Sequence, residues 1–242
     1  KYDFDEVIFV GSWTSYHAGF LGTYWLWDIW NIKSSVEVAS ELEFKKFEIN
    51  EKKLFVFISQ SWETADSIEI LKYIKSRWWK TLWIVNVVGS TISRLTDFGM
   101  FTRAWTEVWV ASTKAFLSQI SAILLLALYF GKRNNLSHAH FGKILSEFKE
   151  IPEKIEQIIK ESEKIKNIAK EISEYKNFFY LWRHYQLPIA SEWSLKLKEI
   201  SYLHSESYWA WELKHWPLAL IQEDFPSVMC IPWDFLFDKN MS

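Results

Sequence analysis

The chain has 242 residues, of which 49% are hydrophobic, so it can bury a sizeable core in one large domain or two smaller ones. Its 28 basic and 30 acidic side chains nearly cancel, which argues against a nucleic-acid groove or a polybasic membrane face. A single cysteine, Cys230, excludes an internal disulfide, and the longest apolar run, 120–130, is too short to span a bilayer, so we expect a cytoplasmic protein.

The first half of the chain alternates predicted strands with predicted helices, and the strands end in turns rich in hydroxyl groups. Strands are predicted at 7–10, 36–39, 54–58, 81–85 and 101–103, and helices at 16–29, 65–77 and 111–130. This alternation predicts an α/β fold with a doubly wound parallel sheet covered by helices on both faces. In such a fold, ligands bind at the carboxyl ends of the strands, where these hydroxyl turns lie.

The turn Ser59-Gln60-Ser61-Trp62-Glu63-Thr64 follows a strand that is apolar throughout and precedes an amphipathic helix. A helix N-terminus offers unpaired N–H groups and a partial positive charge, so hydroxyls beside it predict a cradle for a phosphate or another anion. The alternative is that Ser61 or Thr64 only caps the helix, because Ser and Thr are ordinary N-cap residues.

The second half begins with a helical connector at 136–175, whose isoleucine stripe we expect to pack along one face. A strand at 178–181, a helix at 188–203 and two further strands at 219–221 and 228–231 follow. On the helix, Glu192, Lys196 and Glu199 share one face at i, i+4 and i+7. They form either a surface salt-bridge ladder or a buried acid/base pair in which Lys196 keeps Glu199 ionised. His215 is either a structural residue or a second proton carrier.

Four segments of the chain resemble the isomerase half of the glucosamine-6-phosphate synthase family, the glutamine:fructose-6-phosphate amidotransferases. They run from Gly11 to Gly19, from Ser59 to Asp66, from Val110 to Phe116 and from Glu192 to Leu220. That half contains two sugar isomerase (SIS) domains, so the resemblance implies a complete first SIS domain at 1–135, a connector at 136–175 and a truncated second SIS domain at 176–242. The family's glutaminase half and its C-terminal tail, which carries a reactive lysine, are not in this sequence. Together with Lys1 in place of methionine, this predicts a fragment excised from a longer chain.

The resemblance also implies a role for each candidate site residue. Glu199 is the base that moves a proton between C1 and C2 during ketose-to-aldose conversion in amino sugar biosynthesis, with Lys196 beside it. His215 assists ring opening in the site of the neighbouring subunit, which implies a homodimer. The substrates are fructose 6-phosphate and glucosamine 6-phosphate, and we expect no cofactor and no metal. The phosphate is held by Ser15, Ser59, Gln60, Ser61 and Thr64, and the sugar is lined by Val110 and Ser112.

Tryptophan is abundant in this chain and glycine is scarce: there are 16 Trp and 7 Gly residues, where average usage would give about 17 glycines. Ten tryptophans stand where we expect glycine in relatives, and a side chain in a left-handed turn costs about 1–2 kcal/mol. A non-catalytic sugar-phosphate-binding SIS module or an engineered inactive variant therefore stays open. A glucosamine-6-phosphate deaminase, which runs a related reaction backwards, is a further alternative. The ten are Trp13, Trp62, Trp78, Trp83, Trp105, Trp109, Trp182, Trp193, Trp211 and Trp216.

Overall fold

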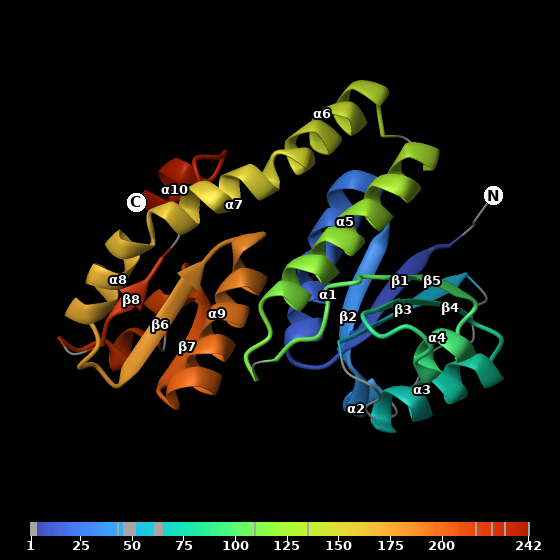
Figure 1. The fold of residues 1–242 in the computed structure, drawn as a ribbon, viewed down its shortest axis with the longest axis horizontal. Coiled ribbons are helices and arrows are strands. Elements are labelled where there is room, and N and C mark those ends of the chain that lie inside the picture. The colour runs from blue at the N-terminus through green and yellow to red at the C-terminus, as the bar shows by residue number, and fades with distance from the viewer. Residues whose placement is uncertain are drawn as a thin grey trace.

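The structure is a computed structural model that describes residues 4–42, 44–45, 52–60, 65–108, 110–134, 136–215, 217–223, 225–229 and 231–241. It contains two parallel sheets, one built from the first half of the chain and one from the last third. Figure 1 shows the two sheets side by side, with a run of helices crossing above from one to the other.

The larger sheet confirms the predicted doubly wound topology. Its five strands are β1 (Glu6–Gly11), β2 (Lys33–Val38), β3 (Lys53–Ser59), β4 (Lys80–Val85) and β5 (Phe98–Phe101). They are all parallel and lie in the order β2-β1-β3-β4-β5. The chain builds first to one side of β1 and then to the other, so the strand order reverses between β1 and β3. The carboxyl ends of these two strands form the crevice where doubly wound folds bind ligands.

Helices cover both faces of this sheet because the buried strands are apolar on both sides. In β1, Val7 and Phe9 point to one face, and Ile8 and Val10 point to the other. The first face packs against α1 (Thr14–Trp25), the π-helical turn Leu26–Trp30 and α5 (Lys114–Asn134). The second face packs against α2 (Ala39–Leu42), α3 (Ala65–Ser76) and α4 (Thr91–Leu95).

The helix α5 is long and apolar enough to cross a membrane by length and composition alone. However, 56% of its most apolar window is buried inside the fold. Phe116, Ile123 and Phe130 on α5 belong to the same core as the strands β1, β3 and β4. Glycine permits this close packing at Gly22 of α1, where a Cβ atom would lie 2.7 Å from Cγ2 of Ile123. These contacts are those of a core helix.

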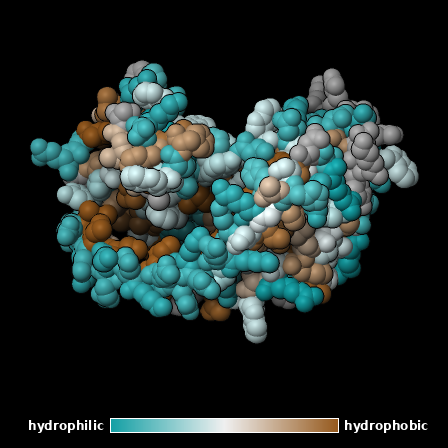
Figure 2. All heavy atoms as spheres, turned by 90° about the horizontal axis from the view of Figure 1, so that it is seen from above, coloured by the Kyte–Doolittle hydropathy of each residue, from teal (hydrophilic) through white to brown (hydrophobic). Residues whose placement is uncertain are grey.

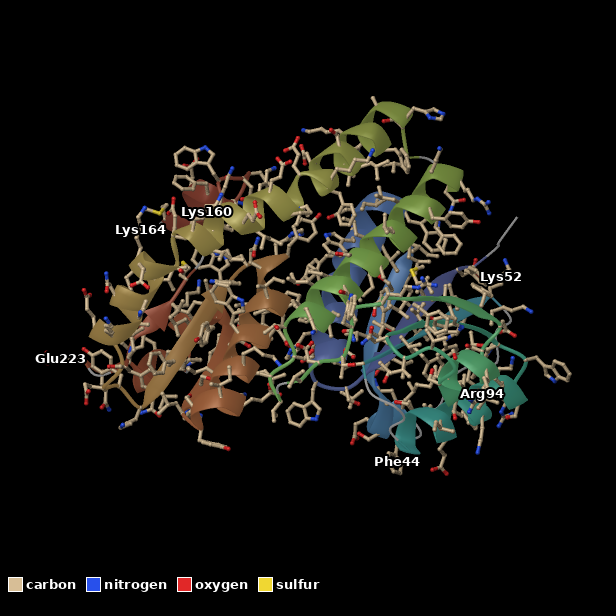
Figure 3. All side chains as sticks on the ribbon, viewed as in Figure 1. Phe44, Lys52, Arg94, Lys160, Lys164 and Glu223 are labelled. Carbon is tan, nitrogen blue, oxygen red and sulfur yellow. The ribbon has the colours of Figure 1, made fainter. Side chains whose placement is uncertain are left out.

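Three helices connect the two sheets: α6 (His138–Lys149), α7 (Ile151–Lys160) and α8 (Ser162–Glu171). The expectation that their isoleucine stripe is packed is wrong for this chain, because none of their described residues is buried. Ile158, Ile159 and Ile165 are each more than half exposed. Figure 2 shows hydrophobic atoms gathered around a hollow in the half of the molecule that holds α7 and α8. The charged residues point to solvent, as Lys160 and Lys164 do in Figure 3.

The smaller sheet contains β6 (Asn177–Trp182), β7 (His204–Trp209) and the short β8 (Ser227–Val228), all parallel, in the order β7-β6-β8. Helix α9 (Gln186–Ser201) packs on β6 and β7 and also contacts α1, so it joins the two sheets. Three sequence predictions need correction here. The strand β7 was not predicted, the strand expected at 219–221 is a 3-10 turn (Pro217–Leu220), and the edge strand expected at 101–103 ends at Phe101. The remaining elements are the 3-10 turn Glu212–Lys214 and α10 (Phe237–Met241).

Candidate active site

A small cavity of about 190 Å³ lies at the carboxyl ends of β1 and β3. Ser15, Ser59 and Gln60 line it, and these are three of the five residues predicted to hold phosphate. Ser112, predicted to line the sugar, borders the same cavity. The other two predicted phosphate residues, Ser61 and Thr64, lie outside the described residues. We call this cavity the cradle.

The N-terminus of α1 supplies one wall of the cradle, because Thr14 and Ser15 are its first two residues and both line the cavity. Helix α5 holds the Ser15 hydroxyl in place, because Gln119 Nε2 on α5 donates a hydrogen bond to Ser15 Oγ at 3.1 Å. Both residues are buried. A helix N-terminus with an oriented hydroxyl suits an anion, since its first N–H groups lack partners in the helix and its macrodipole favours negative charge.

A wider cleft of about 830 Å³ adjoins the cradle and shares Gln60 and Ser112 with it. Val110, the other residue predicted to line the sugar, borders this cleft with 88% of its surface exposed. Two further lining residues, Arg103 and Asn86, were not predicted. Arg103 brings a cation to the lining, and Asn86 holds the backbone of the cleft wall in place. Asn86 Oδ1 accepts a hydrogen bond from the backbone N–H of Ala104 at 2.7 Å.

The ladder on α9 is anchored by a buried carboxylate, with Lys196 and Glu199 half-buried beside it, so it is not a surface salt-bridge ladder. Glu192 is 2% exposed. Its Oε1 accepts a hydrogen bond from Thr14 Oγ1 at 2.8 Å and lies 3.2 Å from Lys196 Nζ. Its Oε2 lies 2.7 Å from Nδ1 of His17. Lys196 Nζ in turn donates to Glu199 Oε2 at 2.7 Å. We call these five residues the Glu192 cluster.

Thr14 connects the Glu192 cluster to the cradle. Its side chain lines the cradle, donates to Glu192, and accepts a hydrogen bond from Lys196 Nζ at 3.1 Å. The structure therefore places Lys196 against Thr14 of the cradle and Glu199 one contact further away, beside Lys196. The contacts of Thr14 and His17 with Glu192 were not predicted, because these residues lie 178 and 175 residues from Glu192 in the chain. The turn after β1 was the one signal that could have suggested them.

A second polar hollow of about 370 Å³ is lined in part by Trp13, which also borders the cradle. Glu206 and Tyr208 of β7 line it, and the Tyr208 hydroxyl donates a hydrogen bond to the Glu206 carboxylate. That hydrogen bond, together with burial and the charge of Glu206, raises the pKa of Tyr208 to about 12. The phenol is therefore neutral in ordinary buffers, and it is not part of the Glu192 cluster.

The structure places His215 on the surface, directly after the 3-10 turn Glu212–Lys214. Its backbone N–H donates to the carbonyl of Glu212 at 3.0 Å. Among the described residues, His215 borders neither the cradle nor the adjoining cleft. Its predicted role in the site of a neighbouring subunit stays a prediction.

The model of one protein family, described as "SIS domain", matches residues 2–129 of this chain. These residues include the larger sheet and most of the cradle. The chain belongs to the SIS domain family. The cradle is thus the carboxyl-end crevice of an SIS domain.

Comparison with individual proteins extends the similarity beyond residues 2–129 to almost the whole chain. Glutamine–fructose-6-phosphate aminotransferase (isomerizing) of Idiomarina loihiensis is 40% identical over 99% of the chain, and that of Caldanaerobacter subterraneus is 41% identical over 98%. The chain spans 40% and 39% of those two proteins. The C-terminal domain of glucosamine-fructose-6-phosphate aminotransferase from Francisella tularensis has a TM-score of 0.94 and 38% identity, with 98% of this chain and 67% of that one covered. The SIS chain therefore matches the isomerase half, as predicted.

A glucosamine-6-phosphate deaminase from Thermotoga maritima has a TM-score of 0.79 at 23% identity over 98% of this chain and 70% of its own. At that identity the likeness shows a shared fold and nothing about the reaction.

Proposed function

We propose that this SIS protein interconverts the ketose and aldose forms of a hexose 6-phosphate, as the isomerase part of the conversion of fructose 6-phosphate to glucosamine 6-phosphate. One observation carries the proposal: Lys196 Nζ contacts Thr14 at the cradle and Glu199 Oε2 in the same side-chain arrangement. Moving a proton next to a carbonyl needs a carboxylate within reach of the substrate carbon, and Lys196 Nζ holds the Glu199 carboxylate in place by a hydrogen bond of 2.7 Å.

The phosphate occupies the cradle in this proposal. Ser15, Ser59 and Gln60 donate to its oxygens together with the N-terminus of α1, and Ser61 and Thr64 complete the site. Val110 and Ser112 line the sugar. The sugar carbons then extend from the cradle past Thr14 towards Lys196 and Glu199.

Glu199 acts as the base. It takes a proton from C1 of the open-chain ketose, the electrons of that C–H bond form the C1–C2 double bond of an enediol, and the oxygen on C2 takes up a proton. Glu199 then returns its proton to C2 while the oxygen on C1 loses one, which yields the aldehyde. A positioned acid/base group typically contributes about 10² to 10⁴-fold to the rate.

The assembly belongs to the same proposal. Residues 1–135 form the first SIS domain, 136–175 the connector and 176–242 part of a second SIS domain. The protein is a cytoplasmic homodimer in which His215 assists ring opening in the partner's site. The exposed position of His215 supports this, because a surface residue is available to a neighbouring subunit.

The test is interconversion of fructose 6-phosphate and glucose 6-phosphate by the chain and by Glu199→Gln. Glu163→Gln is the matched control, since Glu163 is an exposed α8 residue paired with Lys166. We expect Glu199→Gln to lower the rate by about 10²-fold or more and Glu163→Gln to leave it unchanged. Turnover that survives Glu199→Gln refutes the base assignment. Binding without turnover supports the non-catalytic module, and ammonia release from glucosamine 6-phosphate supports the deaminase.

A further inference from the structure

Three tryptophans have a backbone conformation that tryptophan rarely adopts. Among the described residues, Trp13 has φ 52°, Trp78 has φ 64° and Trp105 has φ 60°. At positive φ the Cβ atom crowds the backbone. Glycine has no Cβ and adopts this conformation freely, and asparagine tolerates it, whereas a bulky residue there is an outlier. The four other non-glycine residues with positive φ are Asn31, Arg103, His184 and Tyr202.

Two of the three tryptophans stand at helix ends in backbone conformations that glycine usually adopts. The Trp78 N–H donates to the carbonyl of Lys75 at 3.0 Å directly after α3, in the left-handed position where helices commonly end in glycine. Trp13 is the N-cap of α1 with φ 52° and ψ −121°, and its side chain makes no capping hydrogen bond. Serine, threonine, asparagine, aspartate and glycine are the usual N-caps, and of these only glycine takes that backbone conformation freely.

The three indole rings bury little of their surface against the rest of the protein. Trp13, Trp78 and Trp105 are 73%, 86% and 86% exposed. Tryptophan stabilises proteins mainly by burying its large ring, so the side chain offsets little of the backbone strain at these positions.

Two of the three rings border the candidate active site. Trp13 lines the cradle and the hollow beside it, and Trp105 lines the adjoining cleft. Trp78 lies elsewhere, between α3 and β4. This separation allows the strain to be tested apart from ligand binding.

We propose that residues 13, 78 and 105 are glycine positions and that the functional protein carries glycine there, as happens where one genetic code reads as tryptophan a codon that another reads as glycine. The chain's 16 tryptophans and 7 glycines agree with such an exchange. Only three of the ten tryptophans that stand at expected glycine positions have positive φ among the described residues. Trp83, Trp182, Trp193 and Trp211 have no positive φ, and Trp62, Trp109 and Trp216 lie outside the described residues.

The first test measures thermal stability, and its outcome does not depend on the proposed function. We expect Trp78→Gly to raise the Tm by about 2–4 °C because it relieves strain at the end of α3. Trp27→Gly is the matched control: Trp27 is also exposed, at 60%, but lies in the helical turn Leu26–Trp30, where glycine destabilises. A fall in Tm for Trp78→Gly overturns the inference.

The second test reads the residue directly in protein purified from its native host. Trypsin cuts after Arg103 and Lys114, so tandem mass spectrometry of the peptide 104–114 identifies residue 105. Glycine at 105 supports the proposal, and tryptophan there overturns it.

The third test rests on the proposed function. Trp13→Gly and Trp105→Gly should each tighten fructose 6-phosphate binding about 10-fold in calorimetry, because each removes a ring from the lining, while Trp78→Gly leaves affinity unchanged. A higher Tm for Trp78→Gly with no binding by any variant refutes the proposed substrate and leaves the glycine assignment supported. Binding that weakens in Trp13→Gly overturns the assignment at the cradle.

Discussion

Replacing Glu192 with alanine removes the centre of the buried cluster that joins α1 to α9. Glu192 meets Thr14 Oγ1 at 2.8 Å, His17 Nδ1 at 2.7 Å and Lys196 Nζ at 3.2 Å, with 2% of its surface exposed. Breaking a buried ion pair by removing one partner costs about 3–5 kcal/mol. Lys196 keeps Glu199 as a partner at 2.7 Å, so we expect the lower end of that range, about 3 kcal/mol.

Thermal unfolding followed by circular dichroism measures this loss. In a domain of this size 1 kcal/mol shifts the Tm by about 2–4 °C, so Glu192→Ala should lower the Tm by about 6–12 °C. Glu192→Gln keeps the shape and one acceptor for Thr14, so it should cost less than alanine. A Thr14→Val variant completes a double-mutant cycle, for which contacting residues give a coupling energy of about 0.5–3 kcal/mol.

Two results would refute this reasoning. A loss below about 1 kcal/mol for Glu192→Ala would mean that the carboxylate behaves as an exposed surface pair. A coupling energy near zero in the cycle with Thr14 would mean that the two sheets are joined by other contacts. Lys164→Ala, which removes an exposed pair with Glu161, serves as the surface control and should change the Tm little.

Three further predictions concern pH and packing. Burial acts to raise the pKa of Asp97, but hydrogen bonds from Lys75 and Thr81 and the charge of Lys75 outweigh it and hold that pKa below its ordinary 3.8. Asp97 therefore contributes stability that is present above the unfolded pKa and is lost as pH falls through the folded pKa, so acid melting curves should show a loss below about pH 4 that Asp97→Asn lacks. Gly22→Ala should destabilise by about 1–3 kcal/mol in urea titration, because its Cβ would lie 2.7 Å from Ile123, and an unchanged midpoint would contradict this packing. Tyr208 should ionise only near pH 12 in an ultraviolet titration, and Glu206→Gln should bring that midpoint down towards 10.

The sequence predicted the larger sheet well because local pattern and tertiary structure agree there. Strands such as Lys53–Ser59, buried on both faces, read as continuous apolar runs, and the helices between them have a clear period. The hydroxyl turns after those strands predicted a site at one edge of the sheet, because the carboxyl ends of parallel strands share that edge, and the family resemblance supplied Ser15 and Gln60.

The smaller sheet was harder to predict because its signals are not local. The strand His204–Trp209 is rich in polar residues, so its sequence does not read as a buried strand. It is a strand because it pairs with β6, and the side chain of Ser205 is fully buried against Ser194 of α9. The isoleucines of α7 predicted a packed stripe because periodicity reports an apolar face and not what covers it. Sequence spacing likewise could not tell whether Glu192 was buried, because α1 on the other side of the cluster comes from the start of the chain.

The contact between Thr14 and Glu192 spans 178 residues, and this separation has a consequence for synthesis on the ribosome. The larger sheet and its cradle are complete once α5 has emerged at Asn134, whereas Lys196 and Glu199 are translated later. A nascent chain can therefore fold the larger sheet and the cradle before the α9 residues of the Glu192 cluster have been synthesised. Long-range closure of this kind is slow compared with local folding. Under the proposed function, the phosphate site is therefore made before the base that acts on the sugar.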